Sequence, residues 1–453
     1  MWYLKGQAHV SADHWPLTPE SQRLYSMPNP MHIVILSDLL PPDEPGGAGR
    51  VAWQLGQGYV AAGQRVTFIT SSPGPSRVER RDGFTVHVLH SRYAERWRAW
   101  FGLFNPQTVW PLNHLLRQLR PDVVHAHNIG GHLSYHSLVI ARYAGAATVF
   151  TAHDAMTFVY GKLTYFIDPS RPEQCDGFNY RLPFGYNLRQ MRLRWNPARN
   201  LSIRHTLRYY TDARVAVSHE LKKALEANRL PPFEVVHNGI DPSRFDVPEA
   251  AIAVLRQRYK LEGRRVILFG GRLNRAKGDQ QLLAALRGVR QVVPDVALLV
   301  LARSDDYLQR LLGEHPDLRD VIVPGGWLEG AELAAAYRLA QVVALPSVCF
   351  ETFGLAALEG MAAGAVPVVT CFGGPREVVV DGETGFVVNP HNTDVLADRL
   401  IRLLTDESLR ARMAAAGRAR VEAHFTLKHQ VEAMLAVFER ALARQSARSR
   451  HRR

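Results

Sequence analysis

Short apolar segments that alternate with helical patterns are the feature that most constrains how this chain folds. The segments lack alternating polar residues, which is typical of strands buried on both faces in a parallel sheet covered by helices. The first series of predicted strands comprises His32–Ser37, Arg65–Thr70, Thr85–Leu89, Val123–Ala126, Thr148–Thr151, Arg214–Ala216 and Glu234–His237. The second comprises Val266–Gly270, Ala297–Leu301, Val321–Val323, Val342–Leu345 and Val366–Val369. Two successive series of this kind predict an α/β chain with two doubly wound domains.

Chain length and turn residues give the expected domain boundaries. A chain of 453 residues is too long for a single hydrophobic core. The segment Val235–Pro242 reads as a strand followed by turn residues, so we place the boundary just after it. We therefore expect a first domain over residues 31–245 and a second over residues 246–427. A helical pattern over residues 428–443 is expected to pack back on the first domain.

The two ends of the chain do not share this pattern. Residues 1–30 have no hydrophobic periodicity and no apolar stretch of signal-peptide length. We expect Met31 to be the natural start, or residues 1–30 to be a loose extension; an arm that packs on the body is the alternative. Residues 444–453 contain five Arg and no acid, which predicts a solvated tail or, alternatively, a contact with anionic lipid.

Composition narrows the class of protein. The chain is 46% hydrophobic and 21% charged, which excludes a mostly disordered protein. Its three cysteines are far apart and lack a Cys-x-x-Cys spacing, so reduced thiols in a cytoplasmic protein are the simplest reading. No apolar run is long enough to span a bilayer. The net charge of +13 permits a nucleic-acid partner, but the chain has no recognised RNA or DNA motif, so we expect none.

Two loops that follow predicted strands suit an anionic ligand. Gly46 and Gly47 precede a predicted helix, and glycines there let backbone N–H groups approach a phosphate at the helix N-terminus. A plain tight turn explains these glycines equally well. Arg272 and Lys277 follow the first strand of the second domain, where two cations can bracket a diphosphate at about 1.5–3 kcal/mol each. Solvated surface cations are the alternative.

Two carboxylates at one expected helix start are the strongest chemical feature. Glu351 is expected in the loop after the strand Val342–Leu345, and Glu359 about two turns into the following helix. A diphosphate would rest on the N–H groups near Gly354 and Leu355, with Glu359 accepting bonds from a ribose and Glu351 from a sugar. A capping carboxylate and an unrelated surface Glu are the alternative. Glu359, however, lies among small apolar residues, where a carboxylate is costly without a partner.

Taken together, these motifs resemble the family 4 retaining glycosyltransferases of GT-B fold. The likeness runs in order from about Met31 to Ala443. The residues that carry it are Glu351 and Glu359 as the E-x7-E motif, Gly271-Arg272 and Lys277-Gly278 as the donor-phosphate cations, Val236–Asp241 as the interdomain signature and Gly46-Gly47 as the glycine loop. The resemblance implies two Rossmann-like domains that face each other across a cleft, a sugar-nucleotide donor, and net retention at the anomeric carbon.

The resemblance also implies roles for single residues. Arg272 and Lys277 would neutralise the leaving nucleoside diphosphate, Glu351 would hold hydroxyls of the donor sugar, and Glu359 would hold the ribose. His153, at a strand end, looks like the active-site His near the donor sugar. No cofactor and no metal are expected, which agrees with the absence of any Asp-x-Asp pair from the sequence. Backbone near Gly326–Leu328 is a weaker candidate for contact with the base.

Three further stretches leave their function open. Residues 160–210 are rich in aromatic residues and Arg, which predicts either an acceptor lid or a surface subdomain with its own core. Residues 92–104 mix Trp and Phe with Arg, which suits either an interfacial membrane contact or core packing. The histidines between His125 and His136 suggest a metal, but acceptor-side lining or packing is favoured.

The expected function is therefore transfer of a sugar from a nucleotide-diphosphate sugar to a glycan, lipid-linked or small-molecule acceptor without metal. We expect the protein to be cytoplasmic, with peripheral contact at an anionic membrane as a further possibility. Another sugar-nucleotide enzyme of the same fold, an epimerase or a phosphorylase, is one alternative. A non-catalytic basic scaffold is the other.

Overall fold

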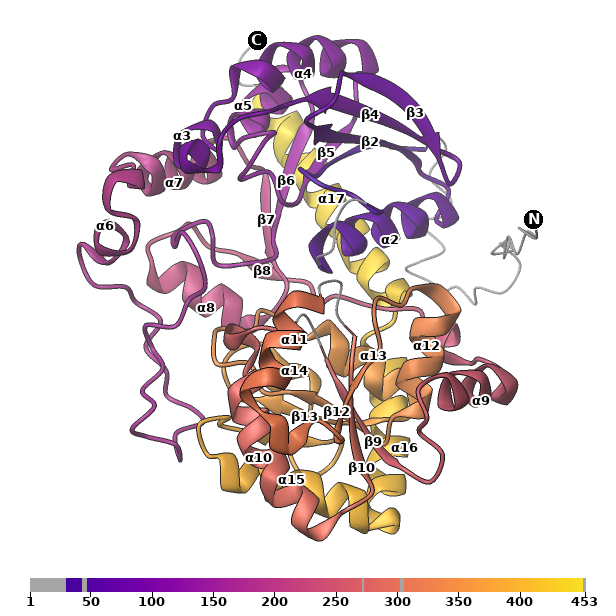
Figure 1. The fold of residues 1–453 in the computed structure, drawn as a ribbon. Helices are drawn as coiled ribbons and strands as arrows, with labels where there is room; N and C mark the ends of the chain where they lie inside the picture. Colours follow the sequence, from indigo (N-terminus) through magenta and orange to yellow (C-terminus); the bar gives the residue numbers. More distant parts are fainter. Residues whose placement is uncertain (1–29, 43–46, 271–272, 302–304, 451–453) are drawn as a thin grey trace.

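A computed structural model describes residues 30–42, 47–270, 273–301 and 305–450. The chain forms two α/β domains, one above the other in Figure 1, each built around its own sheet. The predicted two-domain α/β fold is therefore confirmed. The expected extension, residues 1–30, lies outside the described residues apart from Pro30.

The first sheet has eight strands and is parallel except at one edge. In spatial order its strands are β3 (Arg77–Arg81), β4 (Phe84–His90), β2 (Arg65–Ser72), β1 (His32–Leu36), β5 (Val123–Ala126), β6 (Ala147–Ala152), β7 (Ala213–Ala216) and β8 (Glu234–Val235). The central strands are buried along their whole length, as their unbroken apolar sequence predicts. The antiparallel strand β3 was not predicted, because its sequence is mostly charged and it lies at the edge.

Helices pack on both faces of the first sheet or on its edges. They are α2 (Gly47–Ala61), α3 (Arg98–Phe101), α4 (Pro106–Leu119), α5 (His136–Tyr143), α6 (Tyr186–Met191), α7 (Arg199–Tyr209) and α8 (His219–Ala227), with short 3-10 turns η2 (Glu95–Trp97) and η3 (Arg192–Arg194). Helix α4 is capped by Asn105, whose side chain accepts a hydrogen bond from the Gln107 amide. Its first residue is Pro106, a common residue at this position.

The second sheet has six parallel strands. Their order is β11 (Ile322–Pro324), β10 (Val296–Val300), β9 (Arg265–Phe269), β12 (Val342–Leu345), β13 (Val366–Thr370) and β14 (Phe386–Val388). The surrounding helices are α9 (Glu249–Arg258), α10 (Asp279–Val292), α11 (Asp305–Glu314), α12 (Gly330–Leu339), α13 (Leu355–Ala363), α14 (Pro375–Val378), α15 (Thr393–Thr405) and α16 (Glu407–His424), with 3-10 turns η4 (Pro242–Phe245), η5 (Arg275–Lys277) and η6 (Pro316–Leu318). The short edge strand β14 was not predicted.

The chain crosses between the domains twice, and the two crossings lie side by side. Ile240 forms a parallel bridge with Thr426; the Ile240 amide donates to the Phe425 carbonyl (2.9 Å), and the Leu427 amide donates to the Ile240 carbonyl (2.7 Å). A Cβ at Gly239 would lie 2.2 Å from the Thr426 carbonyl oxygen. The glycine of the predicted interdomain signature is therefore required by the close approach of the returning chain.

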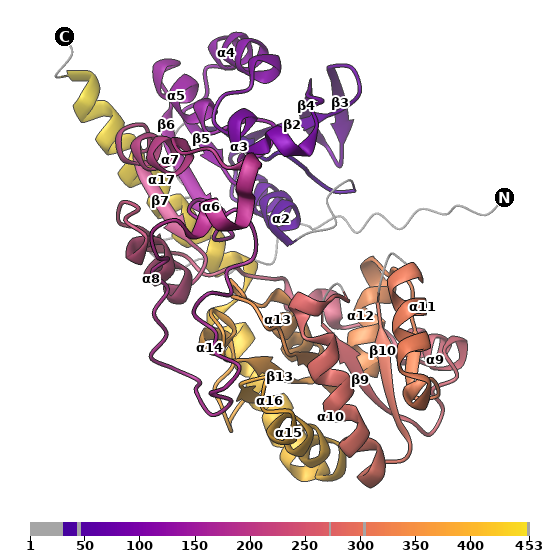
Figure 2. The same cartoon turned by 60° about the vertical axis from the view of Figure 1, so that its left-hand side comes forward.

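The last helix, α17 (Leu427–Arg450), leaves the second domain and packs on α2, β6 and β7 of the first (Figures 1 and 2). It is longer than the predicted helix 428–443. Most of residues 444–450 are exposed, as a solvated tail predicts, but they continue the helix and do not form a separate tail. The reason is a buried carboxylate, Asp212, which pairs with Arg448, while Arg444 donates to the Asp212 carbonyl (2.6 Å). Residues 451–453 lie outside the described residues.

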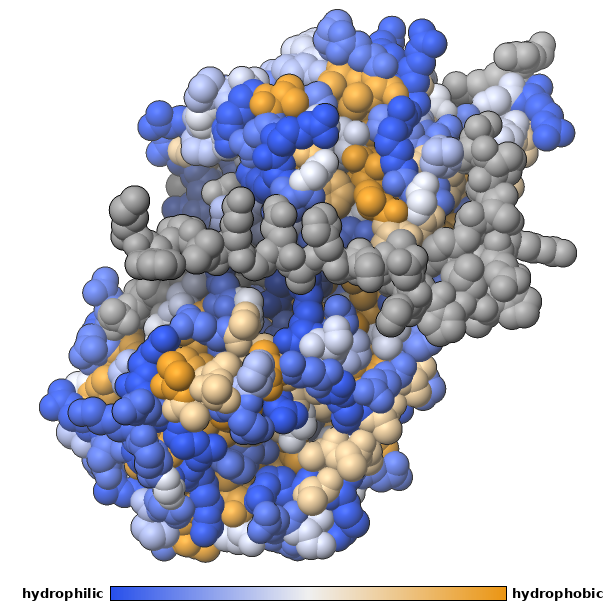
Figure 3. All heavy atoms as spheres, turned by 90° about the vertical axis from the view of Figure 1, so that its right-hand side faces the viewer, coloured by the Kyte–Doolittle hydropathy of each residue, from blue (hydrophilic) through white to orange (hydrophobic). Residues whose placement is uncertain are grey.

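The surface is mostly polar over both domains on the face drawn in Figure 3, and apolar side chains there form scattered patches. Across the described residues, no helix combines the length and the apolar composition needed to cross a bilayer.

Candidate active site

A cleft of 850 Å³ lies between the two domains. Its first-domain wall includes Gly47 and Arg50 of α2 and His153 after β6. Its second-domain wall includes Lys277 and the start of α13. The lining segments thus follow the carboxyl ends of parallel strands, where open α/β sheets bind ligands. The predicted site residues that line this cleft are Gly47, His153, Lys277, Glu351, Gly354, Leu355 and Glu359.

Lys277 and Glu351 form a close ion pair in the cleft. The Lys277 ammonium lies 2.5 Å from Glu351 Oε2, which also accepts a hydrogen bond from the Ser347 hydroxyl at 3.0 Å. Burial by itself raises the pKa of Glu351, but Lys277, the nearby Lys162 and the Ser347 hydroxyl together hold that pKa below its ordinary value. Glu351 is therefore a carboxylate at neutral pH.

The backbone at Gly278 places Lys277 beside this carboxylate. Gly278 has a φ of +78°, and a Cβ there would lie 1.7 Å from the Pro346 carbonyl oxygen. Only glycine fits this contact. The loop after β9 is thereby held against the loop after β12, and the cation of one loop meets the acid of the other.

Glu359 lies on the cleft side of α13 and has two partners. Tyr337 of α12 donates its hydroxyl to Glu359 Oε2 at 2.7 Å, and Arg50 of the first domain lies 2.9 Å from Oε1. Burial, followed by the charge of Glu359, raises the pKa of Tyr337 well above its ordinary value, so the phenol stays a donor. Helix α13 begins at Leu355, so Glu359 lies about one turn into it; the predicted two turns were wrong.

The first turn of α13 lies between the two acids. Gly354 caps the helix with a φ of +91°, and Leu355 is its first residue. A Cβ at Gly47 would lie 3.0 Å from Leu355 Cδ1, so the glycine loop of the first domain faces this helix start across the cleft. Two other predicted site residues, Gly46 and Arg272, lie outside the described residues.

His153 lines the cleft from the first domain, and its ring is nearly buried. Its Nε2 lies 2.7 Å from Nδ1 of His127. Burial lowers the pKa of His153 to about 4, so the ring is neutral at pH 7. Among the described residues, the metal-like grouping considered for His125–His136 is not formed.

Sequence reasoning missed several residues that line the cleft. Arg50 directly follows the glycine loop, and that position was the one available signal for it. Asp154 directly follows His153 in the sequence. Asn238 belongs to the interdomain signature and Lys162 to the stretch 160–210, but neither was assigned to the site. Arg244 and Tyr337 come from segments with no motif of their own. Trp327 and Leu328, from the stretch considered for base contact, also line the cleft.

The aromatic residues of the insertion pack on one another and on the second domain. Phe166 and Tyr180 pack edge to face on Phe350 of the second domain, and Phe166 and Phe178 pack likewise on Phe372. In Figures 1 and 2 the segment between β6 and α6 runs down beside the second domain. Tyr180 is buried, whereas Phe166 and Phe178 are half-buried. Within residues 160–180 the aromatic cluster is therefore shared with the second domain and does not form a separate surface core.

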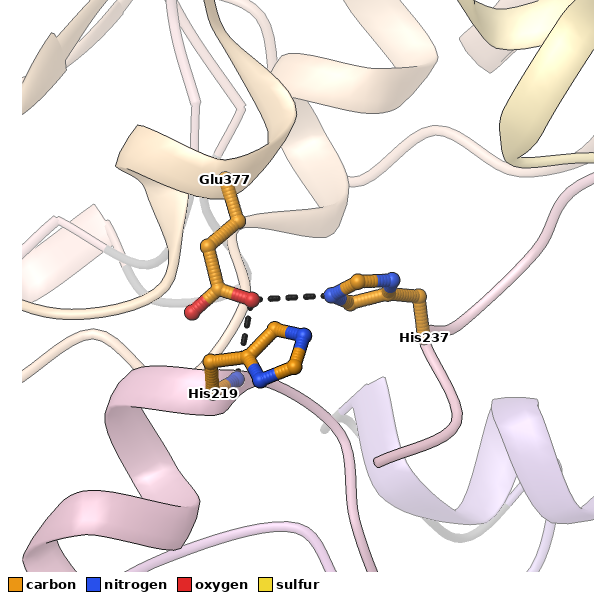
Figure 4. A group of neighbouring side chains, drawn as sticks. All are labelled: His219, His237 and Glu377. Atoms are coloured by element: carbon orange, nitrogen blue, oxygen red, sulfur yellow. Dashed lines mark hydrogen bonds and ion pairs between the residues drawn. The ribbon is translucent and has the colours of Figure 1, made fainter. Parts of the chain in front are cut away.

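A second interdomain contact lies at the hinge, where His219, His237 and Glu377 meet (Figure 4). His237 Nε2 lies 2.8 Å from Glu377 Oε2, and the amides of His219 and Glu220 donate to the two carboxylate oxygens at 2.8 Å each. The carboxylate of α14 thus caps α8 of the other domain. None of these three side chains lines the cleft.

The overall architecture is shared with solved structures. The fold matches sucrose-phosphate synthase from Thermosynechococcus elongatus with a TM-score of 0.70 at 21% identity, over 91% of this chain and 99% of that chain. It also matches Anabaena HepE in complex with UDP and glucose, with a TM-score of 0.65 at 18% identity, over 90% and 99%. These likenesses show the GT-B fold.

Sequence comparison gives the family. Residues 45–244 match the family model described as glycosyltransferase family 4, and residues 252–420 match the model described as glycosyl transferases group 1. The two matches together take in most of both domains, and the chain belongs to the family 4 glycosyltransferases.

Individual relatives match part of the chain. It is 34% identical over 224 residues to a GDP-mannose-dependent alpha-(1-6)-phosphatidylinositol monomannoside mannosyltransferase of Mycobacterium tuberculosis, covering 48% of this chain and 56% of that protein. It is 36% identical over 223 residues to a D-inositol 3-phosphate glycosyltransferase of Xylanimonas cellulosilytica, covering 48% and 53%. The matched region is thus about half the length of these curated relatives.

Proposed function

We propose that the protein transfers a sugar, with retention at the anomeric carbon, from a nucleotide-diphosphate sugar to a glycan, lipid-linked or small-molecule acceptor without a metal ion. The observation that carries this proposal is the arrangement around α13. The Lys277–Glu351 pair and the buried Glu359 line one interdomain cleft, with the first turn of the helix between them. That arrangement offers the Lys277 ammonium and the amides of the first helical turn to a diphosphate. It also offers Glu351 to the donor sugar at one end of the diphosphate and Glu359 to the ribose at the other.

Each residue has a place in the proposed reaction. The diphosphate rests on the amides near Gly354 and Leu355. Lys277 and Arg272 stabilise the charge that builds on the leaving phosphate, at about 1.5–3 kcal/mol each. Glu359 accepts ribose hydroxyls and Glu351 accepts hydroxyls of the donor sugar.

The bond changes are simple. The bond between the anomeric carbon and the phosphate oxygen breaks, and the acceptor oxygen bonds to that carbon from the same face. The acceptor proton goes to the leaving phosphate oxygen, so no protein base is needed. His153 contacts the donor sugar. The second domain binds the nucleotide, and the first domain, with Gly46 and Gly47 on its loop, faces the acceptor.

The relatives' names support the donor and acceptor classes. One relative is named for GDP-mannose and for a phosphatidylinositol acceptor, and HepE was solved with UDP. We therefore favour a nucleotide-sugar donor and an acceptor attached to a lipid.

A lipid-linked acceptor calls for contact with a membrane, and we propose that the first domain supplies it at the inner face. Tyr93 and Phe101 stack on each other at 4.6 Å, so these two residues of the stretch 92–104 are used in packing. The bulkier aromatic residues of this stretch are instead exposed, Trp97 by 48%, Trp100 by 49% and Phe104 by 45%, and so is Trp110 of the following helix α4, by 69%. Exposed Trp beside Arg suits an anionic bilayer surface.

Vesicle binding tests the membrane part of the proposal. The double variant Trp97→Ala, Trp100→Ala should sediment less with vesicles that contain anionic lipid, and the loss should shrink at high salt. Phe184→Ala, which removes a fully exposed aromatic residue outside this region, is the matched control. Equal sedimentation of the double variant and the wild type would contradict a membrane contact here.

Donor consumption tests the chemistry. The purified chain, in EDTA, is incubated with UDP-, GDP- and ADP-sugars and a bacterial lipid extract. We expect a melting shift and turnover with one donor, and an α-linked product from an α-linked donor by proton NMR. Lys277→Met should lower turnover by about 10- to 150-fold. Glu332→Gln, at an exposed pair with Arg258, is the control.

Other outcomes identify the alternatives. An epimerised donor would identify the protein as an epimerase. Release of a sugar phosphate that depends on added phosphate would identify it as a phosphorylase. No melting shift with any nucleotide sugar would favour the non-catalytic scaffold. Turnover that appears only on addition of Mg²⁺ or Mn²⁺ would overturn the metal-free part.

A further inference from the structure

Three buried histidines form a continuous hydrogen-bonded chain behind the cleft. His153 Nε2 lies 2.7 Å from His127 Nδ1, His127 Nε2 lies 3.2 Å from His125 Nδ1, and His125 Nε2 lies 2.8 Å from the Thr151 hydroxyl. Of the three rings, only that of His153 lines the cleft. His125 lies in β5 and His127 directly follows this strand, so the two rings, two residues apart, lie on the same face of the sheet. There they contact Thr151 of the neighbouring strand β6 and His153 in the loop after it.

All three rings are neutral at pH 7. Burial lowers the pKa of His125 to about 3, that of His153 to about 4 and that of His127 well below its ordinary value. A neutral imidazole has one N–H donor and one bare nitrogen acceptor. Every nitrogen inside the chain has a neighbour, so the tautomer of one ring determines the tautomers of the other two.

Only two arrangements satisfy this chain. In the first, each ring carries its proton on Nε2, and each Nε2–H donates away from the cleft, ending at the Thr151 hydroxyl. In the second, each ring carries its proton on Nδ1, and the donors point toward the cleft. The Nε2–H form is the intrinsically favoured tautomer of a neutral histidine in water, so the first arrangement keeps three favoured rings.

Tyr59 and Thr151 are compatible with either arrangement. The Tyr59 hydroxyl lies 3.4 Å from His125 Nδ1, and burial raises its pKa well above the ordinary value, so it keeps its proton. Its oxygen can accept from a protonated Nδ1, or its O–H can share a bare Nδ1 with His127. The Thr151 hydroxyl can likewise donate to His125 Nε2 or accept from it. The preference for the first arrangement therefore comes from the favoured tautomer of the three rings.

We propose that His127 is a positioning residue, which fixes the ring of His153 and leaves its bare Nδ1 as a hydrogen-bond acceptor for a hydroxyl of the donor sugar. Nδ1 of His153 has no partner among the described residues. A flipped His153 ring would lose the bond to His127, so the acceptor stays in one place. This inference rests on the proposed function for its ligand, but the tautomer itself does not depend on it.

The far end of the chain is closed by packing. Phe438 of α17 lies edge to face with His125 at 5.2 Å and with Tyr59 at 5.3 Å. The histidine chain therefore ends against buried side chains. The position of the His125 ring depends on the packing of α17 on the first domain.

Nitrogen-15 NMR of histidine-labelled full-length protein tests the tautomer without substrate. We expect His153, assigned by loss of its signals in His153→Asn, to show a protonated Nε2 and an unprotonated Nδ1 between pH 6 and 8. A protonated Nδ1, or two averaged nitrogens, would overturn the proposal. This measurement needs only the wild type and one assignment variant, so it decides the tautomer even if variants at position 127 do not fold.

Two substitutions test the positioning role. His127→Phe keeps an aromatic ring but removes the acceptor, so His153 should average between tautomers and kcat for transfer should fall about tenfold or more. Affinity for the nucleoside diphosphate, which the second domain holds, should stay within twofold. His127→Asn places an oxygen near the former Nδ1 and should restore the single tautomer and most of kcat.

His32→Phe is the matched control. His32 is equally buried and bonded to Thr67 and Leu119, but it begins β1 at the opposite end of the sheet from the cleft. It should change stability without changing the His153 signals. Unchanged His153 signals in His127→Phe would overturn the positioning role. An unchanged tautomer result together with no transfer from any donor would overturn the proposed function and leave the histidine chain in place.

Discussion

Replacing Glu359 with glutamine should separate binding from folding. In the proposed function the Glu359 carboxylate accepts hydroxyls of the ribose, and hydrogen bonds to a charged acceptor are worth about 1.5–3 kcal/mol. Glutamine keeps the shape but removes the charge. We therefore expect Glu359→Gln to raise the Kd for the nucleoside diphosphate by about 10- to 150-fold.

The expected cost to stability is much smaller. The Arg50 side chain that pairs with Glu359 is 39% exposed, and solvent screening reduces such pairs to about 0–1 kcal/mol. The bond from the Tyr337 hydroxyl survives, because the amide oxygen of glutamine still accepts it. A loss of about 1 kcal/mol lowers the Tm of a domain of this size by about 2–4 °C.

Calorimetric titration with UDP, GDP and ADP gives the Kd, and thermal unfolding of the free protein gives the Tm. Glu332→Gln, which removes an exposed carboxylate on α12, should change neither beyond error. A Kd for Glu359→Gln within threefold of the wild type would refute a ribose role for this acid. A Tm lowered by 10 °C or more would instead show that the carboxylate is needed mainly to hold the two domains together.

Three further changes test other parts of the structure. Gly278→Ala should destabilise the second domain, in thermal unfolding, by more than the roughly 1–2 kcal/mol that a left-handed residue alone costs. Gly263→Ala is the control, because Gly263 has a φ of +69° with open space around it and its replacement should cost only the backbone part. Equal losses of stability in the two variants would contradict the contact between Gly278 and Pro346. The thiol of Cys371 in the second domain donates to the carbonyl of Gln174, the residue before Cys175 of the insertion, at 3.7 Å. Diamide should therefore cross-link Cys175 and Cys371 within one chain, as mass spectrometry of peptides can check; no such peptide would contradict the docking of the insertion. Burial alone raises the pKa of Glu377, but its hydrogen bonds lower it overall from the ordinary 4.5. Its contribution to stability is therefore present above that pH and is lost as pH falls through the folded pKa. Glu377→Gln should lower Tm at pH 7, and the difference from the wild type should shrink steadily as the pH is lowered below 4.5; a constant difference would contradict this.

The central strands could be predicted because strands buried on both faces have an unbroken apolar sequence. The edge strands could not. β3 contains four charged residues among five and is held by its antiparallel partner β4, while β14 has only three residues. In both cases the ladder hydrogen bonds of a neighbour, rather than the strand's own composition, determine the structure.

The site divides in the same way. Lys277, Glu351 and Glu359 could be predicted to line one cleft, because each follows a strand end in one domain and spacing along the chain fixes them. The partners Arg50 and Tyr337 could not, because they depend on how α2 docks against α13 and how α12 packs beside it. The basic tail was misread for a related reason, since its buried partner Asp212 lies 236 residues away in sequence from Arg448.

The paired crossings at Ile240 and Thr426 limit how the two domains can move. A single connection would let one domain swivel freely about a point. Two covalent connections held together by backbone hydrogen bonds, with Gly239 against the returning strand, leave chiefly one angular coordinate. Any ligand that bridges the two walls of the cleft therefore acts along that one angle, and the energy of its binding is not spread over unrelated motions of the two domains.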